Sequence, residues 1–256
     1  FAPGLAEGSP EVVTVAFHTV FNTLGVILVL PFANPFARFI ENLFPEREEP
    51  LTASLDRRLL AEPMAARRAL EGSARAIAAA TLRASADIMR GRQHSMREDT
   101  LLQAIEAARA YAVQVGEVSE EHDLDTGILF DCLHLMDHTE RMAERAFEPG
   151  RAGEVRAVKD LAESVEKLAE DCIGLAEDIE TAGPLTLLPA LEMAAAKLEH
   201  GAPEFRRRLI AAAARGDLGP DALDEALDGI RWLRRMAYHA WRMAVYWTSV
   251  EEMERR

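Results

Sequence analysis

The chain has 256 residues, which is enough for one or two domains with a packed core. Its 43 acidic and 29 basic residues give a net charge of -14, which argues against a nucleic-acid-binding protein, because such proteins neutralise phosphates with Lys and Arg. Two cysteines are too few for a disulfide scaffold. Val, Ile and Thr rarely cluster, so the composition predicts an all-α protein. The first residue is Phe1 rather than Met, so we expect a processed chain or part of a longer protein.

The most apolar segment lies near the start of the chain. Residues 12–37 contain no charged side chain and are flanked by Glu11 and Arg38. A long apolar run is typical of a transmembrane helix, and residues 12–30 would form a helix about 28 Å long, close to the hydrocarbon thickness of a bilayer. The alternative is a buried core helix, but such a helix is usually shorter and amphipathic. We therefore predict one transmembrane helix, ended by Pro31.

The sequence divides into residues 1–45, which contain the predicted span, and residues 46–256, which are predicted to be a helical domain. A stretch rich in proline and charge, residues 44–54, reads as the linker between them. Arg38 and Arg47 follow the span, whereas no basic residue precedes it. The positive-inside rule therefore places the C-terminal side in the cytoplasm.

One face of the predicted span carries polar groups. Thr14, His18 and Asn22 are spaced by four residues and Gly25 follows about one turn later, so all four share a face of a helix. Polar groups are costly in hydrocarbon, so this face should meet other helices or a water-filled pathway. Two interpretations remain open: these residues form the wall of a solute or ion pathway, or they hold helices together. Either one requires further membrane segments.

Beyond the linker, apolar residues recur with helical spacing and are interrupted by Gly and Pro. The pattern predicts six helices, at about 55–90, 96–118, 125–147, 153–181, 189–215 and from 220 to the C-terminus. We expect the fifth to be interrupted near Gly201 and Pro203. Short breaks between long amphipathic helices favour antiparallel neighbours.

An internal repeat relates the third and sixth of these helices. Residues 140–143 (ERMA) align with residues 234–237 (RRMA), 94 positions later. Leu133 aligns with Leu227 at the same offset. Both motifs lie in the third helix of a set of three, so we predict an array of two three-helix bundles.

The third predicted helix has an acidic edge beside its apolar face. Asp137, Glu140 and Glu144 lie at this edge when successive residues are spaced by about 100°. Such carboxylates can bind a divalent metal or act as a conformational latch, and the alternative is salt bridges to nearby arginines. The repeat places Arg234 and Tyr238 at the positions of Glu140 and Glu144, so no matching second metal site is expected. Arg234 falls in an apolar seam and should pair with a carboxylate of a neighbouring helix. Glu140 and the acidic residues of the helix at 153–181 are the candidates.

The sequence contains no recognisable catalytic set. It has no nucleophile beside a base, no glycine-rich phosphate loop, no CxxC pair and no HExxH motif. The scattered histidines, among them His200 and His239, are expected at the surface or as caps, and Tyr238 and Trp241 are expected to pack against neighbours. The sequence therefore predicts that the protein is not an enzyme.

Three stretches resemble segments of one family of membrane transporters. Residues 16–25 (AFHTVFNTLG), followed by Leu-Pro-Phe at 30–32, resemble the last membrane segment of bacterial sodium/phosphate cotransporters of the type II related family. Residues 55–63 resemble the linker that enters the C-terminal PhoU-like domain of those proteins. Residues 139–144 (TERMAE) resemble the Leu-Glu-Arg-Ile-Gly-Asp motif of PhoU-like domains. The resemblance covers essentially the whole chain.

The resemblance implies the C-terminal portion of a sodium-dependent inorganic phosphate symporter, with sodium as the coupling ion. Its partners would be upstream transmembrane segments of the same transporter, and the full protein would cross the plasma membrane several times. Residues 46–256 would be a cytoplasmic PhoU-like domain that regulates phosphate uptake, and a homo-oligomer is compatible with this role. The alternative is a membrane-tethered PhoU-like regulator that acts on a separate partner.

The resemblance also bears on metal binding. PhoU-like domains bind metal clusters through Glu-x-x-x-Asp motifs on the third helix of each bundle. Glu140 and Glu144 match one motif, with Glu in place of Asp, whereas Arg234 and Tyr238 depart from the other. We therefore expect no tightly bound divalent metal on this domain.

Overall fold

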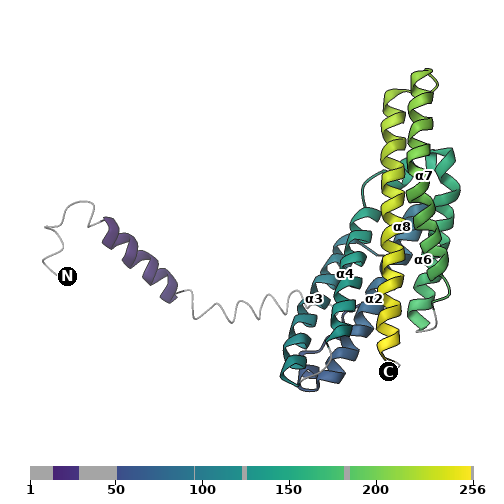
Figure 1. Ribbon diagram of the computed structural model, residues 1–256. Helices are drawn as coiled ribbons and strands as arrows, with labels where there is room; N and C mark the ends of the chain where they lie inside the picture. The colour runs from purple at the N-terminus through teal and green to yellow at the C-terminus, as the bar shows by residue number, and fades with distance from the viewer. Residues whose placement is uncertain (1–13, 29–50, 95, 123–125, 182–184, 255–256) are drawn as a thin grey trace, which may run out of the picture. The chain divides into compact units, whose positions relative to one another are not determined.

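The computed structural model describes residues 14–28, 51–94, 96–122, 126–181 and 185–254 (Figure 1). All regular secondary structure in these residues is helical, which confirms the predicted all-α class. The chain divides into two compact units, Phe1–Glu48 and Glu49–Arg256, and each is described separately.

In the first unit, residues 14–28 form a helix. Its large apolar side chains are 54–66% exposed. At helical spacing they leave two strips of the surface free: one holds the predicted polar stripe, and the other holds Ala16, Thr19 and Thr23. Thr19 and Thr23 donate their hydroxyl protons to carbonyls four residues earlier, so these hydroxyls are satisfied within the helix. Within the part of the chain that the structure describes, every helix falls short of the length and apolar character that a membrane crossing requires. The rest of the predicted span lies outside the described residues.

The second unit is built from helices connected mostly by short turns. Its described elements are η2 (Arg57–Ala61), α2 (Pro63–Arg90), α3 (Glu98–Glu121), α4 (Gly127–Ala146), α5 (Arg151–Ala157), α6 (Lys159–Thr181), α7 (Leu188–Ala214) and α8 (Pro220–Glu254). Proline at the start of α2 and α7 has no backbone N–H to leave unpaired there. The left-handed backbone of Gly91 (φ 66°) ends α2, because its N–H and that of Arg92 bond back to the last turn.

Two helix boundaries differ from the sequence prediction. The helix expected over 153–181 is divided into α5 and α6 at Val158, whose backbone is extended (ψ 103°). The predicted interruption near Pro203 is wrong, because α7 runs through it as one helix. Proline removes one backbone hydrogen bond, but the buried side chains of Ala202 and Phe205 on either side hold the helix against its neighbours.

The helices of the second unit pack as one connected array (Figure 1). α2, α3 and α4 pack against one another as a three-helix bundle. In the second set of three, α7 packs along α8, whereas α6 packs mainly against α2. The second set is therefore less compact than the first, and α2–α6 and α4–α8 are the main contacts between the sets. Small buried residues of α2, such as Ala74 and Ala78, allow neighbouring helices to approach closely.

The packing of α4 against α8 follows the internal repeat. His138 of α4 contacts His239 of α8, and their Nδ1 atoms are 3.0 Å apart. At the repeat offset of 94 residues, these two positions correspond to Trp232 and Arg145. Trp232 Nε1 donates a hydrogen bond of 2.7 Å to the Arg145 carbonyl, so the equivalent contact is also made. The antiparallel helices α4 and α8 thus cross with an approximate twofold relation that exchanges the two repeats.

The two repeats differ where α4 ends. Pro149 and Gly150 (φ 76°) follow the end of α4, and the chain resumes as the short helix α5. α8 passes the equivalent positions without a break, so one long helix matches α4, a turn and α5. α5 packs against α8 at Gly229, where an added Cβ would lie 3.3 Å from the Val155 side chain. The absence of a side chain at Gly229 therefore permits the close approach.

We expect residues 51–256 to fold in water without residues 1–50. The described helices of the second unit bury a continuous apolar core, and this unit is compact by itself. Circular dichroism and gel filtration of a chain truncated at residue 50 should show a helical monomer or a defined oligomer with cooperative unfolding. Recovery of only aggregate, or a spectrum of low helicity, would contradict this expectation.

Candidate functional site

The predicted polar stripe lies on the helix of the first unit. Thr14, His18, Asn22 and Gly25 all fall within residues 14–28, and at helical spacing they share one of the two faces that the large apolar residues leave free. An added Cβ at Gly25 would meet no atom within 4 Å. The structure therefore describes this stripe as an exposed surface, next to apolar side chains that are exposed as well.

The predicted acidic edge of α4 is held in ion pairs. Arg109 of α3 lies 2.6 Å from Glu140 and 4.0 Å from Asp137. Arg141 donates to Asp137 over 2.9 Å, and this hydrogen bond lowers the pKa of the Asp137 carboxyl. Glu144 is exposed. Among the described residues, no group of three or more His, Cys, Asp or Glu side chains is placed to hold a metal ion. The geometry therefore favours the salt-bridge interpretation of Asp137 and Glu140.

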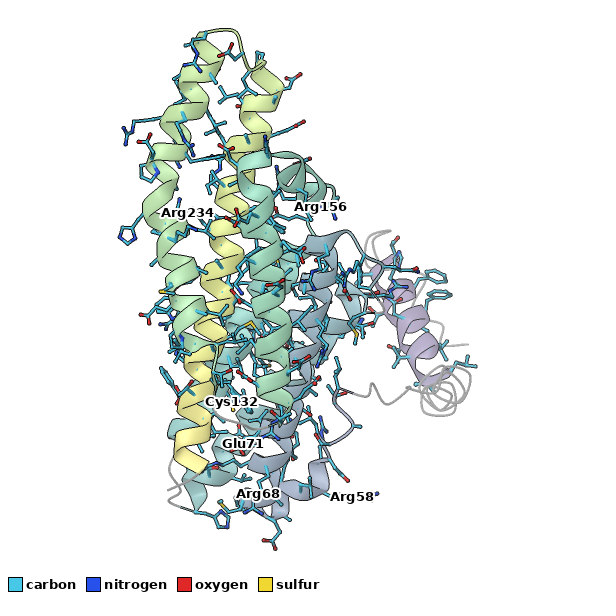
Figure 2. The ribbon with its side chains drawn as sticks, turned by 90° about the vertical axis from the view of Figure 1, so that its right-hand side faces the viewer. Arg58, Arg68, Glu71, Cys132, Arg156 and Arg234 are labelled. Carbon is cyan, nitrogen blue, oxygen red and sulfur yellow. The ribbon has the colours of Figure 1, made fainter. Side chains whose placement is uncertain are left out.

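Arg234, which is labelled in Figure 2, lies on α8. It pairs with a carboxylate of a neighbouring helix, as predicted, but the partner is Glu199 of α7 rather than either candidate. The Arg234 Nε atom donates to Glu199 Oε2 over 2.9 Å, and this contact lowers the pKa of the Glu199 carboxyl. The Arg234 side chain is 25% exposed, so it lies at the edge of the seam rather than inside it. The acidic edge of α4 is thus not the partner of Arg234.

A cluster of imidazole and aromatic rings joins α4 to α8, and we call it the histidine junction. It consists of His134, His138, Tyr238, His239, Trp241, Arg242 and Tyr246. Tyr246 stacks on His134 at 4.8 Å and on His138 at 5.6 Å between ring centroids. Arg242 lies over the Tyr246 ring at 4.7 Å and donates to its hydroxyl. Rings from the two helices therefore fill this crossing.

The expectation that His239 lies at the surface is wrong. His138 and His239 are each only 8% exposed. Burial lowers the pKa of both imidazoles, and burial together with the neighbouring His138 lowers that of His239 to about 4. One Nδ1 atom must donate and the other accept, so the pair fits together when at least one ring is neutral. The repeat offset does not fix the register between α4 and α8, so the sequence carries no signal that pairs these two histidines.

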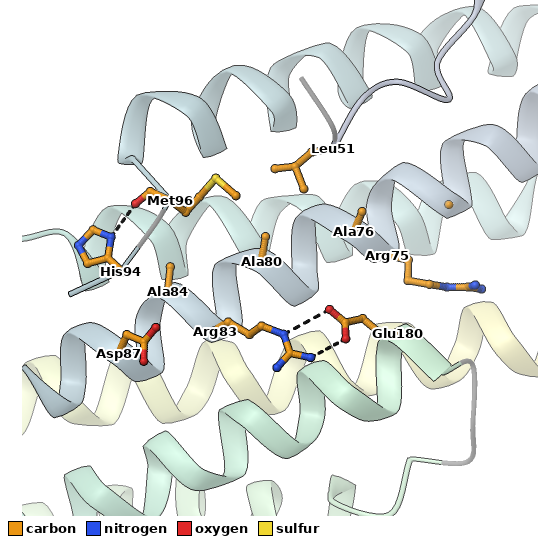
Figure 3. A pocket seen from close by; sticks show the side chains of 11 residues that line it. Leu51, Arg75, Ala76, Ala80, Arg83, Ala84, Asp87, His94, Met96 and Glu180 are labelled. Atoms are coloured by element: carbon orange, nitrogen blue, oxygen red, sulfur yellow. Dashed lines mark hydrogen bonds and ion pairs between the residues drawn. The ribbon is translucent and has the colours of Figure 1, made fainter. Parts of the chain in front are cut away.

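A groove runs along α2 and encloses a cavity of about 450 Å³ (Figure 3). Gly72, Ala76, Ala80 and Ala84 form its small-residue wall, and the side chains of Leu51 and Met96 face them. Arg83 of α2 and Glu180 of α6 close one edge with two hydrogen bonds. The charged groups at this edge already bind each other, so the groove offers mainly apolar contact.

Comparison with protein-family models, with curated proteins and with solved structures finds no match to this chain.

Proposed function

We propose that this chain is the C-terminal part of a sodium-dependent inorganic phosphate symporter of the plasma membrane. Residues 46–256 would be its cytoplasmic PhoU-like domain, which regulates uptake and catalyses no reaction. The observation that carries the proposal is the pairing, in one chain, of an uncharged helix with exposed apolar sides and a repeated helical array. Large apolar side chains that are this exposed need a surrounding that is not water, whether lipid or other apolar helices.

The helical array supports a regulatory rather than a catalytic role. Many of its charged residues form ion pairs on helix surfaces, as at Arg83–Glu180 and Arg90–Glu166. The resemblance at residues 139–144 is to domains that link phosphate status to transport. The twofold crossing of α4 and α8 agrees with the tandem organisation that the resemblance implies.

Uptake of radiolabelled phosphate tests the proposal. The complete reading frame that contains this chain should restore sodium-dependent uptake to bacterial cells that lack their own phosphate transporters. Deleting residues 51–256 should leave uptake active and abolish its decline as internal phosphate accumulates. If the frame transports nothing but changes uptake by a separate transporter, the alternative of a tethered regulator replaces the symporter. No effect on phosphate uptake in either form would contradict both.

Asn22→Leu should impair phosphate uptake by the full transporter more than Val26→Leu, its control one turn further along. Asn22 lies on the polar stripe, whereas Val26 is one of the exposed apolar residues. If the stripe lines the pathway, uptake falls while membrane insertion is retained. If Asn22 holds helices together, the stability of the helix association falls instead, by about 1–2 kcal/mol at most, and the expression level falls with it. Normal uptake and normal stability of Asn22→Leu would exclude both interpretations.

A further inference from the structure

An arginine-rich hollow occupies the crossing that is equivalent to the histidine junction. Its lining residues, which we call the arginine junction, are Arg145, Glu148, Arg151, Asp228, Arg231, Trp232 and Arg235. They come from the end of α4, the following turn, α5 and the middle of α8. The hollow encloses about 150 Å³. Its floor is Trp232, which is 3% exposed and fixed by its hydrogen bond to the Arg145 carbonyl.

Guanidinium groups outnumber carboxylates in this hollow. Glu148 pairs with both Arg145 and Arg151. Asp228 likewise pairs with Arg151, over 3.5 Å, and with Arg231. The two carboxylates of the lining are therefore each shared between two arginines.

The surplus of positive charge has no further partner in the lining. Glu154, which is outside the lining, forms one more ion pair with Arg151, with 2.7 Å between Arg151 Nη1 and Glu154 Oε2. Arg235 forms no ion pair with a carboxylate anywhere in the part of the chain that the structure describes. Each guanidinium has five N–H groups, so many donors remain for an anion. This surplus stands in a chain whose net charge is -14.

The repeat explains why space remains here and not at the histidine junction. At the offset of 94 residues, His134 corresponds to Asp228 and Tyr246 corresponds to Ala152. At the histidine junction the Tyr246 ring packs on His134. In the other repeat, position 152 carries only a methyl group, and Asp228 lines a hollow instead. The same helix crossing is thus filled by rings in one repeat and by charged groups around a cavity in the other.

We propose that the arginine junction binds one inorganic phosphate ion. Arginine presents paired N–H donors that match the oxygens of a tetrahedral oxyanion. Glu148 and Asp228 add acceptors, which suit the P–OH group of phosphate and repel sulfate, because sulfate carries no proton at neutral pH. The volume of the hollow fits a group of this size rather than a nucleotide. The ion would connect α4, α5 and α8 at the contact between the two repeats.

Direct binding to the whole chain, purified in a non-ionic detergent, tests this site. Calorimetric titration at constant ionic strength should show phosphate binding with about one site per chain, and phosphate should raise the thermal midpoint. Arg235→Gln should weaken phosphate binding by about tenfold, the effect of one charge-assisted hydrogen bond. Arg206→Gln on α7 is the matched control, because Arg206 is equally exposed and lies outside the hollow.

Other ligands and a second variant identify the anion. Sulfate should bind more weakly than phosphate, and Asp228→Asn should reduce that preference. ATP should bind no more tightly than inorganic phosphate. Absence of phosphate binding to the unaltered chain, equal affinities of the Arg235→Gln and Arg206→Gln variants, or binding of sulfate or ATP as tight as that of phosphate would overturn the proposal.

Only the link between this ion and the control of uptake rests on the proposed function. If the chain binds phosphate but the complete protein neither transports nor regulates phosphate, the proposed function fails and the site stands. If uptake is regulated but the chain binds no phosphate, the site fails and the proposed function stands.

Discussion

Trp232→Ala should lower the free energy of unfolding by about 3–5 kcal/mol, the range for removing a large buried aromatic side chain. Trp232 is 3% exposed, lies between α4 and α8, and donates its Nε1 proton to the Arg145 carbonyl. The substitution therefore removes both the packing of the ring and one of the hydrogen bonds between the repeats. Urea unfolding of the chain in detergent, followed by circular dichroism, measures the loss from the shift in midpoint at unchanged slope.

Two further variants separate the contributions to this effect. Trp232→Phe keeps most of the buried ring and loses the hydrogen bond, so it should cost about 1 kcal/mol. Trp241→Ala on the same helix is the control, because Trp241 is only half-buried, and its loss should cost clearly less. Equal destabilisation by Trp232→Ala and Trp241→Ala would show that the α4–α8 crossing is not the principal contact that the structure indicates.

Lowering the pH from 6.5 to 4 should destabilise the chain on the order of 2 kcal/mol through His239 alone. Burial lowers the pKa of His239 to about 4, whereas an unfolded histidine titrates near 6.5. Between these two values the unfolded chain binds more protons than the folded chain. The free energy of unfolding therefore falls as the pH is lowered, and the contribution of His239 is lost by about pH 4.

The window from pH 6.5 to 5 isolates the histidine contribution. Carboxyl groups with lowered pKa, such as Asp137 beside Arg141, lose their stabilising effect at a lower pH. Unfolding in urea at several pH values should therefore show a shallower slope in this window for His239→Gln than for the unaltered chain. His200→Gln, at an exposed histidine of α7, should leave the slope unchanged. Identical slopes for the two variants would exclude His239 as the titrating group.

The helices of the second unit were largely predictable, because each carries an apolar face and several, such as α2 and α7, end at Gly. The exception at Pro203 has a tertiary cause: the buried side chains of Ala202 and Phe205 hold α7 together where local preference alone would break it. At Val158, by contrast, the structure has a break between α5 and α6 although no Gly or Pro lies there to predict one. Local sequence therefore predicts which segments are helical better than it predicts where a helix is continuous.

The candidate sites were harder to predict, because they depend on which helices become neighbours. Sequence alone located the acidic edge of α4, but the arginine that neutralises Glu140 comes from α3. The requirement for a carboxylate near Arg234 was correct, since a half-buried guanidinium needs one, yet Glu199 could not be chosen among many acids. The histidine pair was missed for the same reason: its members lie on two helices whose pairing and register the sequence does not determine.

The continuous helix α8 has a mechanical consequence. It is 35 residues long, about 52 Å, and this single uninterrupted helix carries residues of both the histidine junction and the arginine junction. Trp232 and His239 are separated by about two turns, roughly 10 Å along the axis. Because a helix resists stretching along its axis, a sliding movement of α8 at one junction is transmitted to the other almost unchanged. The first repeat has no such uninterrupted helix, since the turn at Pro149 and Gly150 separates α4 from α5. The two halves of the array therefore share a fold but differ in stiffness.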